Sequence, residues 1–356
     1  MKKRLVRMAA LMMSATMLLS VAGCGSSGTP SDPDTKKEEK EEQAEEGAAD
    51  IEYVEYPLAQ VYDTDMSVLK DMKIGFAQRT TSIAWETAVL NNMIETADKY
   101  GAELIYTDAG NDQTKQLSDV EDLCSQGIDA LVYPAVEYES GAAALEIAAD
   151  YEVPVFLLSQ DCKKTEDQYV AAAYGDYVMD ARLCGEWIVN NLDSAKIVEI
   201  QGQLGTDTEM RREKGFGEAI AAGGDKYEII VQQTGNFVMD DAQQAMENII
   251  QSKAGQFDTV FCHNDEMALG VCAALKANQL NDITVVAVDG QKAAVQKIID
   301  GEISAIAICD TRQAEYAFSM IAAWKNGDDM IKDTSIPSEM IDSVNAKEAM
   351  TNGMAF

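Results

Sequence analysis

Residues 258–271 read DTVFCHNDEMALGV and contain the only histidine of the chain, His263. The first half is apolar and β-branched, as a buried strand is, and the second half has the apolar spacing of a helix. Asn264 stands where the strand should end, and either Asn264 or Asp265 can cap the helix that follows. The stretch therefore predicts a strand, a short polar turn and a helix.

The polar turn raises the question of a metal site, because His263 lies between Cys262 and a run of side chains that carry oxygen. Protein zinc sites usually combine several histidines or cysteines, and this chain has no second histidine. We therefore expect His263 to be a partly buried imidazole with hydrogen-bond partners. Asp265 and Glu266 would favour the helix N-terminus, where negative charge is stabilising. We expect no metal and no cofactor.

The alternation of strand and helix continues on both sides of this stretch, from Met72 onward. The expected strands are 73–78, 102–108, 129–135, 153–159, 169–175, 195–201, 227–233, 258–264, 283–289, 304–309 and a last one near 336–344. The expected helices are 84–100, 112–126, 140–150, 177–192, 209–222, 240–253, 266–277, 291–300 and 312–326. Nearly continuous apolar strands with helices between them are typical of parallel α/β sheets. These strands are too many for one sheet of ordinary size, so we predict two Rossmann-like lobes that face a shared cleft with the carboxyl ends of their strands.

The N-terminus has the layout of an export signal. MKKRLVRMAALMMSATMLLSVAGC (1–24) has a basic start and an apolar run that is too short to span a bilayer comfortably. Its end, VAGC, resembles the lipobox of bacterial lipoproteins. This resemblance implies a signal peptide over 1–23 and a lipid anchor on Cys24 that holds the protein at the outer side of the cell membrane. Residues 24–50 predict a disordered acidic tether, and 51–71 form a more apolar lead-in segment.

The net charge argues against nucleic-acid binding, and the cysteine spacing bears on disulfides. The net charge is −33, so no basic surface is available for nucleic acid. Besides Cys24 the chain has six cysteines without a CxxC pair, and we expect buried free thiols rather than disulfides.

Eight segments in order suggest a known family: IGFAQRTTSIAW (74–85), GIDALVYPAV (127–136), VPVFLL (153–158), IVEIQGQLGT (197–206), RREKGFGEAI (211–220), VFCHNDEMALG (260–270), VVAVDG (285–290) and IIDGEI (298–303). Together they resemble the type I periplasmic sugar-binding proteins of ABC transporters, above all the ribose- and galactofuranose-binding branch. The resemblance implies two lobes joined by three hinge crossings that close around a ligand. The crossings are expected near Gly175, Asp310 and Ile336. The N-terminal lobe would then be 72–174 plus 310–333, and the C-terminal lobe 175–309 plus 336–356.

The resemblance also implies a ligand site. A sugar requires planar polar groups around its hydroxyls and aromatic rings against its C–H faces. Trp85 and Phe237 are the expected stacking rings, Arg212 the expected fork onto ligand oxygens, and Asp289 an acceptor for two hydroxyls. The full set of expected ligand contacts is Gln78, Trp85, Glu86, Tyr133, Asp161, Arg212, Phe237, Asn264, Asp289 and Asp310. The alignment at the second crossing leaves Cys309 and Asp310 open, and Asp310 is preferred on chemistry alone.

Two departures from the family pattern leave the ligand open. Ser159-Gln160-Asp161 stands where many relatives have Asp-Arg, and Tyr133 replaces an asparagine-type contact. The ligand could be a sugar, a polyol, an amino sugar or another metabolite. A protonated amine would suit four carboxylates: Glu86, Asp161, Asp289 and Asp310.

The expected function is that of a monomeric solute-binding lipoprotein that delivers a small molecule, foremost a monosaccharide, to an ABC transporter permease. The alternative is a sensor of the same fold that presents its closed form to a membrane receptor kinase. A transcription regulator would need an N-terminal DNA-binding domain, where this chain has a signal and a tether. The sequence contains no G-x-S-x-G, H-E-x-x-H or P-loop motif, so we do not expect an enzyme.

Overall fold

The computed structural model describes residues 54–356. The expected signal peptide, the acidic tether, Cys24 and the first residues of the lead-in segment lie outside the described residues.

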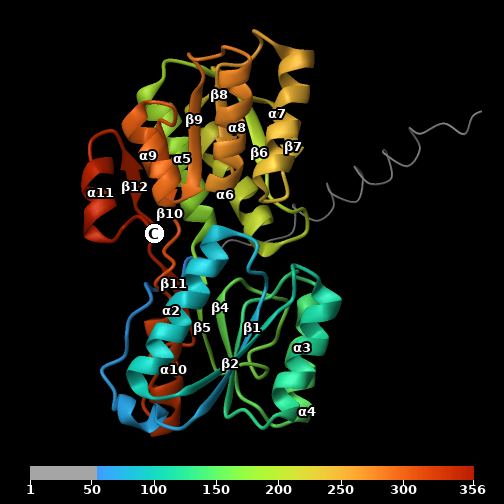
Figure 1. Ribbon diagram of the computed structural model, residues 1–356, viewed down its shortest axis with the longest axis vertical. Coiled ribbons are helices and arrows are strands. Elements are labelled where there is room, and N and C mark those ends of the chain that lie inside the picture. Colours follow the sequence, from blue (N-terminus) through green and yellow to red (C-terminus); the bar gives the residue numbers. More distant parts are fainter. Residues whose placement is uncertain (1–53) are drawn as a thin grey trace, which may run out of the picture. The chain divides into compact units, whose positions relative to one another are not determined.

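The first lobe is built on a six-stranded parallel sheet with the strand order β11-β5-β4-β3-β1-β2. Its strands are β1 (Lys73–Gln78), β2 (Glu103–Asp108), β3 (Ala130–Tyr133), β4 (Val155–Ser159), β5 (Ala171–Gly175) and β11 (Asp333–Ile336). Helices α2 (Ala84–Tyr100) and α10 (Ala314–Asn326) pack on one face, and α3 (Gln113–Ser125) and α4 (Ala143–Asp150) on the other (Figure 1). Short 3₁₀ turns, η1 (Met66–Leu69) and η2 (Ser140–Ala142), complete this lobe.

The second lobe repeats this plan with the strand order β12-β10-β9-β8-β6-β7. Its strands are β6 (Ala195–Gln201), β7 (Tyr227–Thr234), β8 (Thr259–Cys262), β9 (Thr284–Asp289), β10 (Ala305–Ile308) and β12 (Met340–Asp342). Its helices are α5 (Tyr177–Asn191), α6 (Asp207–Gly223), α7 (Met239–Lys253), α8 (Asp265–Ala277), α9 (Lys292–Asp300) and α11 (Ala346–Asn352). Five strands run parallel, whereas β12 pairs antiparallel with β10.

The chain crosses between the two sheets three times: after β5, after β10 and after β11. The predicted class of two α/β lobes with three crossings is therefore confirmed. The single last strand predicted near 336–344 is wrong, because β11 ends in the first sheet and β12 belongs to the second. Pro337 follows β11 and has no N–H to donate to a continuing ladder, which favours a break at that point. The C-terminal helix α11 was not predicted.

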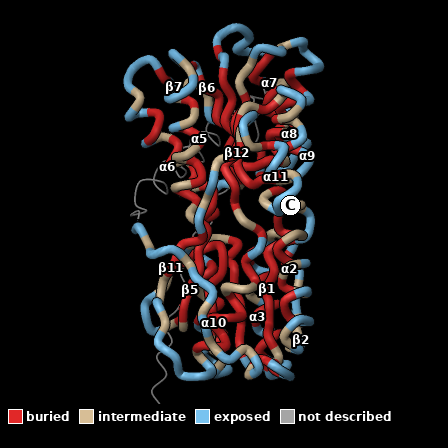
Figure 2. The backbone as a smooth tube through the Cα atoms, turned by 90° about the vertical axis from the view of Figure 1, so that its left-hand side faces the viewer, coloured by how far each residue is buried: buried red, intermediate tan, exposed pale blue. Residues whose placement is uncertain are grey.

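Strand burial explains why these segments form central strands. Every residue of β3, β4, β5, β8 and β10 is buried, as expected for strands covered by helices on both faces (Figure 2). Parallel register brings the carboxyl ends of neighbouring strands together, for example Gln78 beside Asp108 and Asp289 beside Ile308. Polar residues that follow the strands therefore gather at one edge of each sheet.

Close helix packing fixes the helix that carries Arg212. A Cβ atom added at Gly215 of α6 would lie 2.0 Å from the carbonyl oxygen of Val178 in α5, so only glycine allows this approach. The side chain of Thr206 accepts a hydrogen bond from the backbone N–H of Glu209 and caps the start of α6.

The lead-in segment adds backbone pairing to the edge of the first sheet. Ala59 donates to the carbonyl of Ser335 at 2.8 Å, and Ser335 donates to the carbonyl of Pro57 at 2.9 Å. All six cysteines of residues 54–356 are buried free thiols. Within the same residues, no helix has both the length and the apolar character that a bilayer crossing requires.

Candidate functional site

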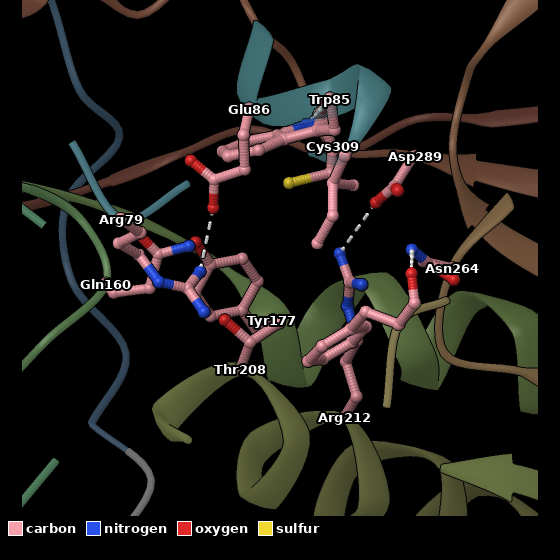
Figure 3. A pocket seen from close by; sticks show the side chains of 12 residues that line it. Arg79, Trp85, Glu86, Gln160, Tyr177, Thr208, Arg212, Asn264, Asp289 and Cys309 are labelled. Carbon is pink, nitrogen blue, oxygen red and sulfur yellow. Dashed lines mark hydrogen bonds and ion pairs between the residues drawn. The ribbon is translucent and has the colours of Figure 1, made fainter. Parts of the chain in front are cut away.

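A small cavity lies among residues of both lobes. It encloses about 360 Å³, part of which is open to solvent. Its lining residues are Arg79, Ile83, Trp85, Glu86, Gln160, Tyr177, Thr208, Arg212, Phe237, Asn264, Asp289 and Cys309 (Figure 3).

Arg212 is the most heavily contacted charged group of the cavity. Its Nη2 lies 3.2 Å from Asp289 Oδ1 and 3.3 Å from Asp180 Oδ2, and its Nη1 donates to the backbone carbonyl of His263. The guanidinium also lies over the ring of Tyr177, 5.4 Å from its centroid. These contacts hold a buried cation in one orientation, with its Nε–H left without a partner among the described residues.

Burial determines the ionisation of the carboxylates around Arg212. It raises the pKa of Asp180 to about 6, although the positive charge of Arg212 opposes this change. Burial likewise raises the pKa of Asp289, again against the effect of Arg212. Asp289 also has a backbone φ of 129°, a conformation that side-chain-bearing residues rarely adopt. Strain of this kind is frequent at functional sites, where the surrounding structure holds it in place.

The turn after β8 consists of His263, which is buried in the second lobe, and Asn264, which lines the cavity. Asn264 Oδ1 accepts from the N–H of Met267 at 3.0 Å and caps α8, and Asn264 Nδ2 donates to the carbonyl of Phe237 at 3.3 Å. His263 is fully buried, with its Nε2 2.8 Å from Glu199 Oε1. Burial lowers the pKa of His263, and its hydrogen bond to Glu199 opposes this change. The predicted hydrogen-bond partner is present, but His263 is fully rather than partly buried, and its Nδ1 has no partner among the described residues.

The first lobe contributes a second buried ion pair. Arg79 Nη1 lies 2.9 Å from Glu86 Oε1, and Gln78 Nε2 donates to Glu86 Oε2 at 3.0 Å. Burial raises the pKa of Glu86, and the charge of Arg79 opposes it. Trp85, the neighbour of Glu86 in the first turn of α2, donates from its indole Nε1 to the carbonyl of Cys309 at 2.7 Å. Trp85 is thereby fixed at the cavity wall and joined to the crossing after β10.

Phe237 forms an apolar wall that the local backbone keeps in place. Its φ of 62° lies in the left-handed region. Its ring packs directly over Gly202, where an added Cβ atom would lie 2.0 Å from Phe237 Cζ. Glycine at position 202 is therefore required for the ring to occupy this place.

The structure brings six of the expected contacts to the cavity: Trp85, Glu86, Arg212, Phe237, Asn264 and Asp289. Four others lie elsewhere. Gln78 does not line the cavity but donates from its Nε2 to Glu86 Oε2 at 3.0 Å. Tyr133 is buried in the core of the first lobe, where its hydroxyl donates to the carbonyl of Gly141 at 3.0 Å. Tyr133 therefore belongs to the packing between the sheet and η2.

The other two are engaged in ion pairs away from the cavity. Asp161 contacts Lys164 Nζ at 2.5 Å and Arg211 Nη2 at 3.5 Å. Asp310 holds Arg312 in a two-point contact, with Nε at 2.9 Å and Nη2 at 2.8 Å. At the second crossing Cys309, rather than the preferred Asp310, lines the cavity.

Sequence reasoning missed Arg79, Ile83, Tyr177 and Thr208, and treated Gln160 only as a departure from the family pattern. A signal was available for two of them, because Arg79 directly follows β1 and Gln160 directly follows β4. Ligand-contacting residues of open α/β sheets are found at such strand ends. Tyr177 and Thr208 lie in first turns of helices, where the sequence gives no direction for the side chain.

Several contacts link the lobes around the cavity, among them Ser159 Oγ with the Tyr177 hydroxyl at 2.7 Å and the Asp161–Arg211 ion pair. Besides the Trp85 bond to Cys309, the N–H of Asp161 donates to Asp207 Oδ2 at 3.2 Å. Asn111 Nδ2 donates to Gln203 Oε1. Within residues 54–356, no group of three or more His, Cys, Asp and Glu side chains is placed to hold a metal ion.

Comparisons with known proteins agree with the two-lobed fold. The galactofuranose-binding protein YtfQ of Escherichia coli (strain K12) is 28% identical over 285 residues, which cover 78% of this chain and 87% of YtfQ. The ribose import binding protein RbsB of Bacillus subtilis (strain 168) is 31% identical over 66% of this chain and 75% of RbsB.

Among solved structures, the binding protein of the arabinose ABC transporter from Shewanella sp. ANA-3, bound to α- and β-L-arabinofuranose, is 26% identical with a TM-score of 0.76. The match covers 79% of this chain and 96% of that protein. The family model for the periplasmic binding protein domain matches residues 74–329. This chain therefore belongs to the periplasmic binding protein family, with the type I fold of two lobes and three crossings.

Proposed function

We propose that this protein binds a small neutral sugar or polyol in the cavity between its lobes and delivers it to an ABC importer outside the cytoplasm. One observation carries the proposal. Aromatic walls (Trp85, Phe237) and planar hydrogen-bonding groups (Arg212, Asn264, Asp289) from both lobes line the same cavity. Aromatic rings suit the C–H faces of a sugar, and fixed planar groups suit its hydroxyls.

The charges of the cavity favour a neutral ligand. Each charged lining group already has a partner of opposite sign: Arg79 pairs with Glu86, and Arg212 with Asp289 and Asp180. A charged ligand would add a buried charge beside pairs that are already neutral, which is unfavourable. Of the four carboxylates considered for an amine, Asp161 and Asp310 are absent from the lining. A neutral hydroxylated ligand is therefore the better candidate.

The relatives support the same ligand class. YtfQ is named for galactofuranose, RbsB for ribose import, and the Shewanella protein holds arabinofuranose. All three ligands are neutral sugars. We extend this class, rather than any one of these sugars, to the present chain.

Calorimetric titration of the purified full chain tests the ligand class. The probes are D-galactose, L-arabinose, D-ribose, D-fructose and myo-inositol, with D-glucosamine and D-galacturonic acid as charged counterparts. At least one neutral probe should bind with a Kd in the micromolar range or below, and both charged probes should bind at least about 10-fold more weakly. If D-glucosamine binds most tightly of all the probes, the ligand class is an amine and the proposal of a neutral ligand is wrong.

Uptake by cells of the source organism separates transport from sensing. Deletion of the gene should abolish import of the radiolabelled sugar at low external concentration. Normal import together with a lost transcriptional response to that sugar would support the receptor role instead.

We further propose that residues 1–23 are removed and that Cys24 carries the lipid that anchors the protein. Two acyl chains give stable membrane attachment, which one chain does not. Labelling of cells with an alkyne fatty acid should mark the wild-type protein. A Cys24→Ala variant should be unlabelled, and equal labelling of both proteins would exclude this anchor.

A further inference from the structure

Asp180 lies outside the cavity lining, yet it contacts Arg212, which lines the cavity. Asp180 belongs to the first turn of α5 and is 1% exposed. Its Oδ2 lies 3.3 Å from Arg212 Nη2, and the same nitrogen lies 3.2 Å from Asp289 Oδ1, a contact drawn in Figure 3. Two buried carboxylates therefore share one guanidinium nitrogen, and the single positive charge can balance only one of them.

A proton on one carboxyl would make this group neutral. With both carboxylates ionised, the group of Asp180, Asp289 and Arg212 carries one net negative charge in a buried place, which is unfavourable. Like charges at short distance favour the protonation of one of the two. Asp180 is suited to hold this proton, because the hydroxyl of Ser338 contacts its Oδ1. A hydroxyl can donate to a carboxylate or accept from a carboxyl, so Asp180 keeps this partner in both forms.

The surroundings of Asp180 favour the same form. The other titratable groups that interact with its charge are acids or thiols: Asp176 and Cys184 on its own helix, Asp289 at the end of β9, and Cys309 after β10. Arg212 of α6 is the cation that acts on it among the described residues. Burial raises the pKa of Asp180 to about 6 against the opposing charge of Arg212. Asp180 therefore titrates in the mildly acidic range.

We propose that Asp180 is a positioning residue whose proton sets the charge of the Arg212 group, so that a neutral ligand binds more tightly when Asp180 is protonated. This inference rests on the proposed function and adds a determinant of its specificity. With Asp180 protonated, Arg212 and Asp289 form a neutral pair that suits a neutral ligand. With Asp180 ionised, Arg212 is divided between two carboxylates, and a bound ligand covers a net negative charge.

The sign of the pH dependence follows from linkage. A ligand that prefers the protonated form binds fully below the pKa of the free protein, and its affinity falls as the pH rises above that value. Asp180→Asn keeps the shape of the side chain and removes the titration. We compare it with the wild type by calorimetry of the full chain, using the tightest-binding neutral sugar of the panel above.

The ratio of the wild-type Kd to the variant Kd should increase by about 10-fold between pH 5 and pH 8. At pH 8 the variant should therefore bind the sugar more tightly than the wild type. A purely structural role for Asp180 gives the opposite result, because loss of a contact to Arg212 would weaken binding at every pH. A variant that is weaker than the wild type by one constant factor would overturn the inference.

Glu209→Gln is the matched control. Glu209 is also a buried carboxylate with a raised pKa and lies on the helix of Arg212, but its pKa responds to other carboxylates, Glu213 and Glu199. Its variant should show the same pH dependence of binding as the wild type. If Glu209→Gln and Asp180→Asn change this dependence equally, the effect belongs to any buried carboxylate, and the inference is wrong.

A charged probe tests the specificity directly. At pH 7 the negative charge of ionised Asp180 favours an amine beside the Arg212 group. Asp180→Asn should therefore increase the Kd of D-glucosamine relative to that of the neutral sugar by about 3- to 10-fold. An unchanged ratio would show that the charge of Asp180 does not act on the ligand and would contradict the inference.

The remaining outcomes separate this inference from the proposed function. If the wild type binds no neutral sugar of the panel, the proposed function fails, and the inference fails with it. If the wild type binds and Asp180→Asn keeps the wild-type pH dependence, the function stands and Asp180 has no role in specificity.

Should Asp180→Asn fail to fold, Ser338→Ala decides. The hydroxyl of Ser338 donates to Asp180 and lowers its pKa. Its removal should therefore move the fall in sugar affinity to a higher pH than in the wild type. A pH profile equal to that of the wild type would overturn the inference.

Discussion

The two buried arginines of the cavity, Arg79 and Arg212, are held in different ways. Arg212 lies on a helix and contacts two carboxylates and a backbone carbonyl, all within the second lobe. Arg79 lies in the turn after β1 and contacts one carboxylate, Glu86, within the first lobe. Each lobe thus neutralises its own arginine. Closure of the lobes on a ligand brings together two paired surfaces rather than two opposite charges, so ligand contacts rather than charge attraction should drive closure.

The largest effect on binding is expected from Arg212→Met. The variant loses the guanidinium fork and leaves Asp180 and Asp289 without their cation. Each hydrogen bond to a charged group contributes about 1.5–3 kcal/mol, so the loss of affinity should reach about 100-fold or more by calorimetry. Lys214→Met, at a half-buried position two residues along the same helix and away from the cavity lining, is the control and should bind as the wild type does. Unchanged affinity in Arg212→Met would remove Arg212 from the site.

The Arg79–Glu86 pair should respond asymmetrically in a double-mutant cycle. Glu86→Met leaves a buried guanidinium that cannot lose its charge, whereas Arg79→Met leaves a carboxyl whose raised pKa allows it to become neutral. Urea unfolding at pH 7 should therefore show a loss of about 3–5 kcal/mol for Glu86→Met and a smaller loss for Arg79→Met. The double variant should be more stable than Glu86→Met. Additive losses would mean that the two side chains do not interact.

Gly202→Ala alters the cavity without changing either arginine. The added Cβ atom would lie 2.0 Å from Phe237 Cζ, so the ring must move. Affinity for the sugar should fall by about 10-fold, and stability by about 1–3 kcal/mol. Gly217→Ala is the matched control, because its Cβ atom would meet nothing within 4 Å. Wild-type affinity in Gly202→Ala would exclude Phe237 as a wall of the ligand site.

Glu209 tests whether stability and binding can be separated on the helix of Arg212. Glu209 is buried and does not line the cavity. Burial and then the charge of Glu213 raise its pKa from 4.5 to about 8. Between these values the folded state retains a proton that the unfolded state has lost, so stability falls as the pH rises from about 4.5 to about 8.

Glu209→Gln removes this dependence. The variant should resemble the wild type near pH 5 and exceed its unfolding free energy at pH 8 by an amount on the order of a few kcal/mol, measured with urea. At each of the two pH values, the variant should bind the sugar with the same affinity as the wild type. A constant difference between variant and wild type across this range would contradict the assigned titration.

The sequence predicted strand ends more reliably than side-chain directions. In three places the expected contact lies next to a residue that lines the cavity: Gln78 beside Arg79, Asp161 beside Gln160, and Asp310 beside Cys309. Consecutive side chains of an extended chain point to opposite sides, so a shift of one residue reverses the direction. Apolar patterning places the end of a strand, but the loop geometry after it decides which neighbour faces the ligand.

Tertiary partners explain the other differences. Tyr133 is the last residue of β3, where a ligand contact was expected. Its hydroxyl instead donates a hydrogen bond to the backbone carbonyl of Gly141 within the core. Asp161 lies near the second lobe and is taken up by Lys164 and Arg211 rather than by the cavity. By contrast, four expected contacts belong to long segments in which several residues match the family pattern. These four, Trp85, Arg212, Asn264 and Asp289, all line the cavity.

The most direct test of the central claim is a crystal structure of the protein with the neutral sugar that calorimetry ranks first. We expect the sugar in the cavity, in contact with Trp85 and Phe237, with its oxygens within hydrogen-bond distance of Arg212 and Asp289. A sugar bound outside this cavity would contradict the account. So would a sugar that contacts neither Arg212 nor Asp289 and neither aromatic ring.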